Sequence, residues 1–160
     1  MDPSNPSTFR KQLVWIAVFD KERKHVLLKA FSGGRELGLM DGVPILKETT
    51  EQAAYRIVKE TTGLTSLRMF DPRQTDPVLV IREPGRDIHI YRFWHQDIRS
   101  VKADCVVRDY KLTRLYVKEF SDVLVANHKW LIPMLCDRNI HGCQVVQYGE
   151  STHRSSNLNF

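Results

Sequence analysis

The N-terminal part of the chain carries runs of β-branched and aromatic residues that are separated by charged or glycine-rich segments. The first run, Gln12 to Phe19, is rich in valine, isoleucine and tryptophan, and it ends at a charged turn, Asp20 to Arg23. A second run extends from His25 to Phe31 and stops at Ser32 to Arg35, which contains consecutive glycines. Runs of this composition on either side of a polar turn are typical of a β-hairpin. We therefore predict that the two runs are paired strands.

A helix with recognisable ends is predicted further along the chain. Thr49 is a preferred N-cap residue, and Gln52 follows it at the position where its side chain completes a capping box. Gly63 supplies the left-handed residue that commonly ends a helix. We predict a helix from about Thr50 to Thr62.

The apolar positions of this helix indicate which side faces the core. Ala54 and Val58 are separated by one helical turn, so they share a face, and we expect both to be buried against the sheet. Ala53, Ile57 and Thr61 form the adjacent stripe.

A second hairpin is predicted after the helix. Thr65 to Phe70 is a plausible strand, and Val78 to Ile81 and Ile88 to His95 follow it as further β-prone runs. These two runs flank Glu83 to Arg86, where proline and glycine stand in the order that favours a tight turn.

The second arm of this hairpin has large side chains on both faces, as expected of a central strand. One face carries Ile88, Ile90, Arg92 and Trp94, and the other carries His89, Tyr91, Phe93 and His95. His89 and His95 are candidate ligand contacts, although histidines on a strand face are more often packing or surface residues.

The C-terminal part has a less regular pattern. Val101 to Lys111 is expected to be a loop with some extended structure. Helical periodicity then resumes in the apolar residues Phe120, Val123, Leu124, Trp130, Leu131, Met134 and Leu135. Pro133 falls inside this stretch, so we expect it to kink or divide the helix.

Length and composition fit one globular domain. The chain has 160 residues, of which 42% are hydrophobic and 27% are charged. The polar segments 1–9 and 147–160 are expected to be flexible, which leaves a single domain over residues 10–146. No apolar run approaches the length of a membrane span, and no signal core follows the first residues, so we expect a cytoplasmic protein without membrane association.

The cysteines give no disulfide framework. Cys105, Cys136 and Cys143 are an odd number without regular spacing, which is typical of free thiols in a reducing compartment. A zinc site made of Cys136, His141 and Cys143 is the weaker alternative, because no fourth ligand stands nearby in the sequence.

The net charge of +5 favours a polyanionic partner such as a nucleotide or an RNA. A generally basic, soluble surface is the alternative interpretation. The densest basic cluster is Lys21, Arg23 and Lys24, and no run of five or more basic residues occurs.

The stretch from Gly42 to Leu64 has the spacing of a known signature. It resembles the signature of the Nudix hydrolases: a glycine, five residues, Glu, seven residues, then Arg-Glu-aliphatic-any-Glu-Glu-any-Gly-aliphatic. Leu39 to Gly42 stands in the place of the family's Leu-Pro-Gly-Gly, and Glu48 to Ala54 is close to its usual Glu-Thr-Pro-Glu-Glu-Ala-Ala. The residues in register are Gly42, Glu48, Arg56, Val58, Glu60, Gly63 and Leu64.

The resemblance implies an α/β fold, a Nudix-like α/β/α sandwich with a mixed sheet, and a nucleoside diphosphate derivative as ligand. It also implies Mg²⁺ or Mn²⁺ as the cofactor of pyrophosphate hydrolysis, with Glu60, Glu48 and Asp41 as candidate metal ligands. Gly42 and Asp41 lie in the loop that would approach the cofactor. The candidate catalytic residues are Glu48, Glu60 and Arg56, with Arg56 expected to hold the loop more than to touch the ligand.

Two positions depart from the signature, because Ile57 and Thr61 stand where the family has glutamates. Isoleucine cannot bind a cation, and a neutral threonine is a poor substitute for a carboxylate. Two hypotheses follow. The favoured one is a Nudix-like protein that binds a nucleoside diphosphate derivative or an RNA end, with hydrolysis lost or strongly weakened. The alternative is a divergent, active pyrophosphohydrolase that uses Glu48, Glu60 and Asp41.

Two further segments bear on this resemblance. Thr113 to Phe120 resembles the family's last strand and the start of its C-terminal helix. Asp109 precedes it in the expected loop region, where some relatives supply a further acidic residue, although a solvated loop aspartate is the more common case. The sequence leaves the oligomeric state open, and a homodimer is compatible with it.

Overall fold

The computed structural model describes residues 10–22, 25–31, 36–69, 77–96, 98, 107–111, 128–137, 139–140 and 142–146. The expectations for residues 1–9, 113–120 and 147–160 lie outside these ranges.

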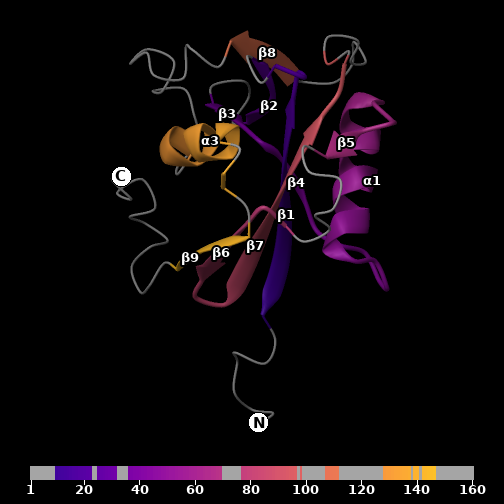
Figure 1. The fold of residues 1–160 in the computed structure, drawn as a ribbon. Coiled ribbons are helices and arrows are strands. Elements are labelled where there is room, and N and C mark those ends of the chain that lie inside the picture. Colours follow the sequence, from indigo (N-terminus) through magenta and orange to yellow (C-terminus); the bar gives the residue numbers. More distant parts are fainter. Residues whose placement is uncertain are drawn as a thin grey trace, which may run out of the picture.

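A mixed β-sheet forms the centre of the described structure (Figure 1). Its main path has the order β3-β2-β1-β7-β6-β9, while β4 pairs with β1, β5 with β7 and β8 with β2. The pairs β1–β7 and β6–β9 are parallel, and the other pairs are antiparallel. The strands are β1 (Lys11–Phe19), β2 (His25–Phe31), β3 (Glu36–Gly38), β4 (Met40–Gly42), β5 (Arg68–Met69), β6 (Leu79–Glu83), β7 (Arg86–Trp94), β8 (Val107–Lys111) and β9 (Cys143–Val146).

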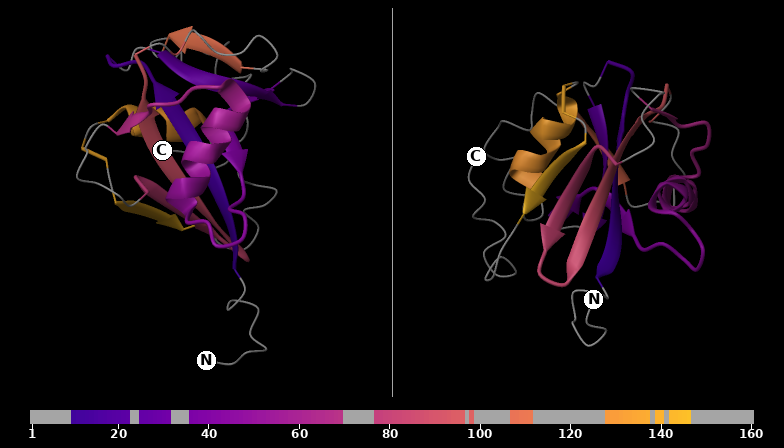
Figure 2. Two further views of the ribbon diagram at one scale, coloured as in Figure 1. Left: turned by 90° about the vertical axis from the view of Figure 1, so that its right-hand side faces the viewer. Right: turned by 60° about the horizontal axis from the view of Figure 1, so that its bottom comes forward.

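Helices α1 (Thr50–Thr62) and α3 (His128–Cys136) lie on opposite faces of this sheet (Figures 1 and 2). The alternation of side chains along β1 accounts for the two layers. Val14, Ile16 and Val18 pack in the cluster that contains α1, whereas Ala17 and Phe19 pack in the cluster that contains α3. The expected α/β/α sandwich with a mixed sheet is confirmed.

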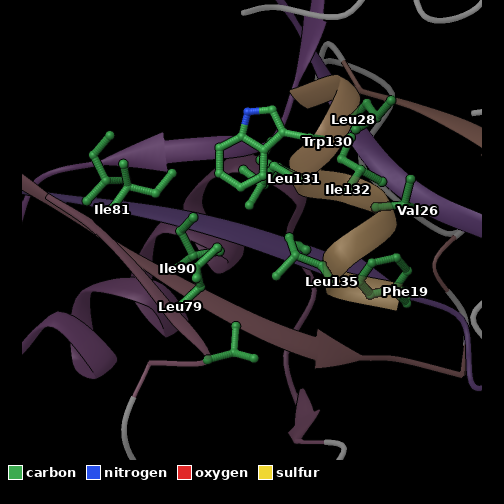
Figure 3. Packing of buried hydrophobic residues seen from close by; sticks show 14 of the residues in the cluster. Phe19, Val26, Leu28, Leu79, Ile81, Ile90, Trp130, Leu131, Ile132 and Leu135 are labelled. Atoms are coloured by element: carbon green, nitrogen blue, oxygen red, sulfur yellow. The ribbon is translucent and has the colours of Figure 1, made fainter. Parts of the chain in front are cut away.

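The apolar core on the α3 side is built from several strands and one helix (Figure 3). Trp130, Leu131 and Leu135 of α3 pack there with strand residues such as Phe19 and Ile90. A buried cation fixes the end of the helix, because Arg92 of β7 donates hydrogen bonds to the carbonyls of Leu135 (2.9 Å), Asp137 (2.8 Å) and Ile140 (3.1 Å). α3 continues past Pro133, so the proline does not divide it.

Helix α1 has the ends that the sequence predicts. Its N-cap Thr49 accepts a hydrogen bond from the Gln52 amide, and the Gln52 side chain accepts one from the Thr49 amide, which completes the capping box. Gly63 ends the helix in a left-handed conformation with φ 82°. Ala54 and Val58 are fully buried, as predicted.

The predicted hairpins are also present. β1 and β2 pair antiparallel, and β6 and β7 pair around Pro84–Gly85, where Gly85 has φ 79°. Within residues 65–69, the described part of the strand expected over residues 65–70, β5 covers only Arg68–Met69, because Ser66 has φ 59°, which an extended strand does not accommodate.

Two elements differ from the sequence-based expectations. Asp109 lies in strand β8, paired with Leu27 of β2, and not in a loop. The chain also returns to the sheet as β9, beside β6, in a region for which the sequence predicted no strand. Within the described ranges, no helix is long and apolar enough to cross a membrane.

Candidate functional site

The loop between β4 and α1 is held to the helix by the guanidinium group of Arg56. Its Nε donates to both carboxylate oxygens of Glu48, at 2.9 and 3.1 Å, and its Nη2 donates to Glu48 Oε1 at 3.0 Å. Nη2 also donates to the carbonyl of Val43 at 2.8 Å, and Nη1 to Glu60 Oε2 at 3.1 Å. One side chain on the second turn of α1 therefore fixes both ends of the loop.

Glu48 is the principal partner of that arginine. Its side chain is 12% exposed, and Oε1 also accepts a hydrogen bond from the Ile45 amide at 3.1 Å. The hydrogen bonds from Arg56 hold the pKa of Glu48 below its ordinary value of 4.5, and the Ile45 amide acts in the same direction. Both carboxylate oxygens are thus occupied in bracing the loop.

Ile57 points in the opposite direction from this network, into the core between α1 and the sheet. It is 4% exposed and packs in the same cluster as Val14 and Val58. Gly42 at the end of β4 lies directly beneath it, because a Cβ built on Gly42 would come 2.5 Å from Ile57 Cδ1. The sequence predicts that Ala53, Ile57 and Thr61 form a stripe beside the core face. In the structure, the side chain of Ile57 belongs to the core itself.

The remaining acidic candidates lie at the surface. The Asp41 side chain is 43% exposed and forms an ion pair with Lys29 of β2 at 3.4 Å. The Glu60 side chain is 63% exposed and has the Arg56 contact at 3.1 Å. Thr61 is partly buried beside Glu60 on the last turn of α1.

Comparisons with solved structures identify the architecture that carries this loop and helix. A Nudix family hydrolase from Clostridium perfringens superposes with a TM-score of 0.60 at 16% identity, covering 80% of this chain and 97% of that one. The chain has the Nudix fold. A Nudix hydrolase from Nitrosomonas europaea gives a TM-score of 0.58 at 18% identity, covering 88% of this chain and 77% of its own.

A third Nudix-fold structure, described as a possible asymmetric diadenosine tetraphosphate hydrolase, comes from Jonesia denitrificans. Its TM-score is 0.51 at 14% identity, with 72% of this chain and 85% of that chain covered. No protein-family model and no curated protein sequence matches the chain. The likeness is therefore one of fold.

Nudix hydrolases generally use divalent metal ions, but the donor groups of this site do not fit one. Ile57 offers only hydrocarbon, both oxygens of Glu48 accept hydrogen bonds from Arg56, and Asp41 forms an ion pair with Lys29. Glu60 is the remaining carboxylate, and its Oε2 accepts a hydrogen bond from Arg56. In the part of the chain that the structure describes, no three His, Cys, Asp or Glu side chains come together as metal ligands. Mg²⁺ requires several oxygen ligands in near-octahedral array, which this set does not supply.

The other candidates lie apart from this loop. His89 sits mid-strand in β7, and both of its ring nitrogens are buried without a hydrogen-bond partner. His95 lines a small cavity beyond the end of β7, together with Trp94. The side chain of Asp109 and residue His141 lie outside the described part of the chain, and Cys136 Sγ donates to the carbonyl of Ile132 at 3.2 Å.

Sequence reasoning did not anticipate Lys29 or Val43. Lys29 stands in β2, and only the packing of the sheet brings it to Asp41. Val43 contributes its backbone carbonyl, a group that every residue type carries, so the sequence gives no sign of this contact.

Proposed function

We propose that this protein binds a nucleoside diphosphate derivative, or the phosphorylated end of an RNA, at the loop between β4 and α1, and that it hydrolyses pyrophosphate weakly or not at all. The observation that carries the proposal is the burial of Ile57 against Gly42, at 4% exposure. A hydrocarbon side chain packed into the core occupies the position that the Nudix signature gives to a carboxylate.

Retention of binding is supported by the parts of the site that remain ordered. Arg56 ties the loop to α1 through Glu48 and the Val43 carbonyl, so the loop is pre-organised even though the charges near it are paired. The assignments of Gly42, Asp41, Glu48, Arg56 and Glu60 to this site are part of the proposal.

A paired measurement of binding and turnover tests the proposal. The protein is titrated by calorimetry with ADP, an ADP-sugar and a 5′-triphosphorylated RNA oligonucleotide, each with Mg²⁺, with Mn²⁺ and with chelator. Phosphate and nucleotide release are followed in the same samples. We expect saturable binding of at least one ligand, with little change on adding chelator and no rapid product release.

Rapid hydrolysis would contradict the proposal in favour of the divergent enzyme. A turnover on the order of 1 per second or faster, abolished by chelator, would mean that Glu48, Glu60 and Asp41 reorganise around a metal ion. Absence of binding to every nucleotide would reject both functions.

A further inference from the structure

A small cavity lies at the end of β7, far from the β6–β7 turn. It has a volume of about 80 Å³ and is lined by Ser66, Arg68, Trp94, His95 and Gln96. The residues of the loop between β4 and α1 are not among its lining residues.

The register of the sheet places the side chains of Trp94 and Arg68, which line this cavity, on the side away from α1. Arg68 of β5 and Phe19 of β1 are the two residues paired with Trp94, one from each neighbouring strand. Directly paired residues project to the same face of a sheet. Phe19 belongs to the core cluster that includes α3, so Trp94 and Arg68 project to that face and not to the face covered by α1.

Two cations are held on the indole ring of Trp94. The guanidinium carbon of Arg68 lies 5.6 Å from the ring centroid, and Lys21 Nζ lies 5.9 Å from it. Lys21 follows β1 and Arg68 belongs to β5, so they approach Trp94 from strands on either side of β7. Cation–π attraction offsets part of the repulsion between the two charges.

Several arginines of the described chain are paired with carboxylates, whereas these two cations are not. Arg56, Arg82 and Arg86 each form an ion pair with Glu or Asp, whereas within the described ranges neither Lys21 nor Arg68 does. Asp20, which precedes Lys21, accepts hydrogen bonds from His25, at 3.1 Å from the amide and 2.7 Å from Nδ1. Among the described residues, the guanidinium group of Arg68, which lines the cavity, therefore has no carboxylate partner that would compete with an anion.

We propose that this cavity binds one phosphate group, in the form of a phosphate monoester or inorganic phosphate. A volume of about 80 Å³ holds roughly five to eight water-sized positions, which suits a single phosphate and is small for a nucleobase. The planar guanidinium of Arg68, which lines the cavity, suits a phosphate dianion, and Lys21 adds positive charge from beside Trp94. Ser66 and Gln96, which also line the cavity, have side chains that can form hydrogen bonds.

The indole ring is a support for the cations in this arrangement and not a stacking platform for a base. Lys21 and Arg68 both lie against its π-system, and Arg68 also lines the cavity. A phosphate bound in the cavity would contact a cation that the indole ring already holds in place, so binding would require little movement of the side chains.

Nuclear magnetic resonance locates the bound phosphate and distinguishes free phosphate from the phosphate group of a nucleotide. Inorganic phosphate, AMP and adenosine are titrated separately into ¹⁵N-labelled protein at low salt, with the Trp94 indole N–H and the Arg68 Nε–H as reporters. We expect saturable shifts of both signals with phosphate and with AMP, and none with adenosine. Tighter binding of AMP than of phosphate would identify a nucleotide as the source, whereas equal binding would identify the free anion.

Charge-neutralising variants provide the matched comparison. Arg68→Gln and Lys21→Gln should each weaken phosphate binding at least about fivefold. Lys11→Gln removes the same charge from the exposed start of β1, and it should change the affinity less than about twofold. These are exposed residues, and a thermal unfolding scan checks that each variant is folded.

Three results would overturn the proposal. They are equal losses of affinity in all three variants, an absence of saturable shifts at Trp94 up to about 50 mM phosphate, and shifts confined to the loop between β4 and α1. The last result would assign the phosphate to the site of the proposed function, so the two proposals fail separately.

Discussion

Ile57 of α1 packs so closely over Gly42 of β4 that a Cβ on residue 42 would lie 2.5 Å from Ile57 Cδ1 and 2.9 Å from Ile57 Cγ1. Residue 42, where the Nudix signature begins with glycine, must be glycine here because the aliphatic side chain of Ile57 leaves no room for a Cβ. A position that carries a carboxylate in the signature has been converted into a core position, and the two residues form one packing unit.

This contact predicts a coupled effect of two substitutions. Gly42→Ala should cost about 1–3 kcal/mol of stability, because the new methyl group forces Ile57 to shift within a packed core. In an Ile57→Val background, which lacks Cδ1, the cost of Gly42→Ala should fall by about half. Urea unfolding of the four proteins in a double-mutant cycle measures the coupling. Additive effects would show that Ile57 moves aside freely.

Restoring the acidic stripe tests whether the site can regain a metal. Ile57→Glu buries a carboxylate at a position that is 4% exposed, so this variant should be clearly destabilised. Thr61→Glu, at a partly buried surface position, should cost less and serves as the control. In the double variant, the new carboxylates and Glu60 should raise Mg²⁺ affinity, so that added Mg²⁺ recovers stability lost in chelator. A Tm that does not change with Mg²⁺ would mean that the carboxylate introduced at residue 57 cannot leave the core to bind a metal ion.

The local signals of the chain were sufficient to predict much of the fold. Thr49, Gln52 and Gly63 fix both ends of α1 through contacts whose partners lie within a few residues in the sequence. The β6–β7 turn is local in the same sense, because Pro84 and Gly85 suit its backbone. The resemblance to the Nudix signature supplied the architecture that joins these elements.

Other features depend on pairing across the chain and could not be predicted locally. β9 is a short strand whose position follows from its partner β6, and Asp109 is extended because β8 pairs with β2. In the candidate site, the signature placed Glu48, Arg56 and Glu60 together, but the pairing of Asp41 with Lys29 required the folded sheet.

Arg56 should act mainly as a brace for the loop. Arg56→Lys loses the fork that contacts Glu48 twice and the Val43 carbonyl, so stability should fall by about 1–3 kcal/mol and the amides of residues 43–48 should exchange faster with deuterium. Glu60→Gln removes only an exposed partner and should cost less than about 0.5 kcal/mol. Equal effects of the two variants would place the bracing interaction at Glu60 and not at Glu48.

His89 predicts a pH dependence of stability in a window set by its own titration. Burial lowers the pKa of His89 below its ordinary value of 6.5, and this outweighs the opposing effect of Asp87, while Arg82 adds to the lowering. Asp87 is held by ion pairs with Arg10 and Arg82. The unfolded chain therefore binds a proton at His89 that the folded chain resists, so stability should decrease as the pH falls below 6.5.

The comparison of wild type with His89→Phe isolates this contribution. Phenylalanine keeps a planar ring on the α1 side of β7, where both imidazole nitrogens lack a partner, and it cannot be protonated. Asp87 has a lowered pKa, so it stays ionised over the same interval and contributes no slope there. Unfolding free energies measured between about pH 7.5 and pH 5 should fall more steeply in wild type than in the variant. Parallel curves would mean that the folded protein accommodates the charged imidazole and that His89 lies in a more hydrated position than its packing indicates.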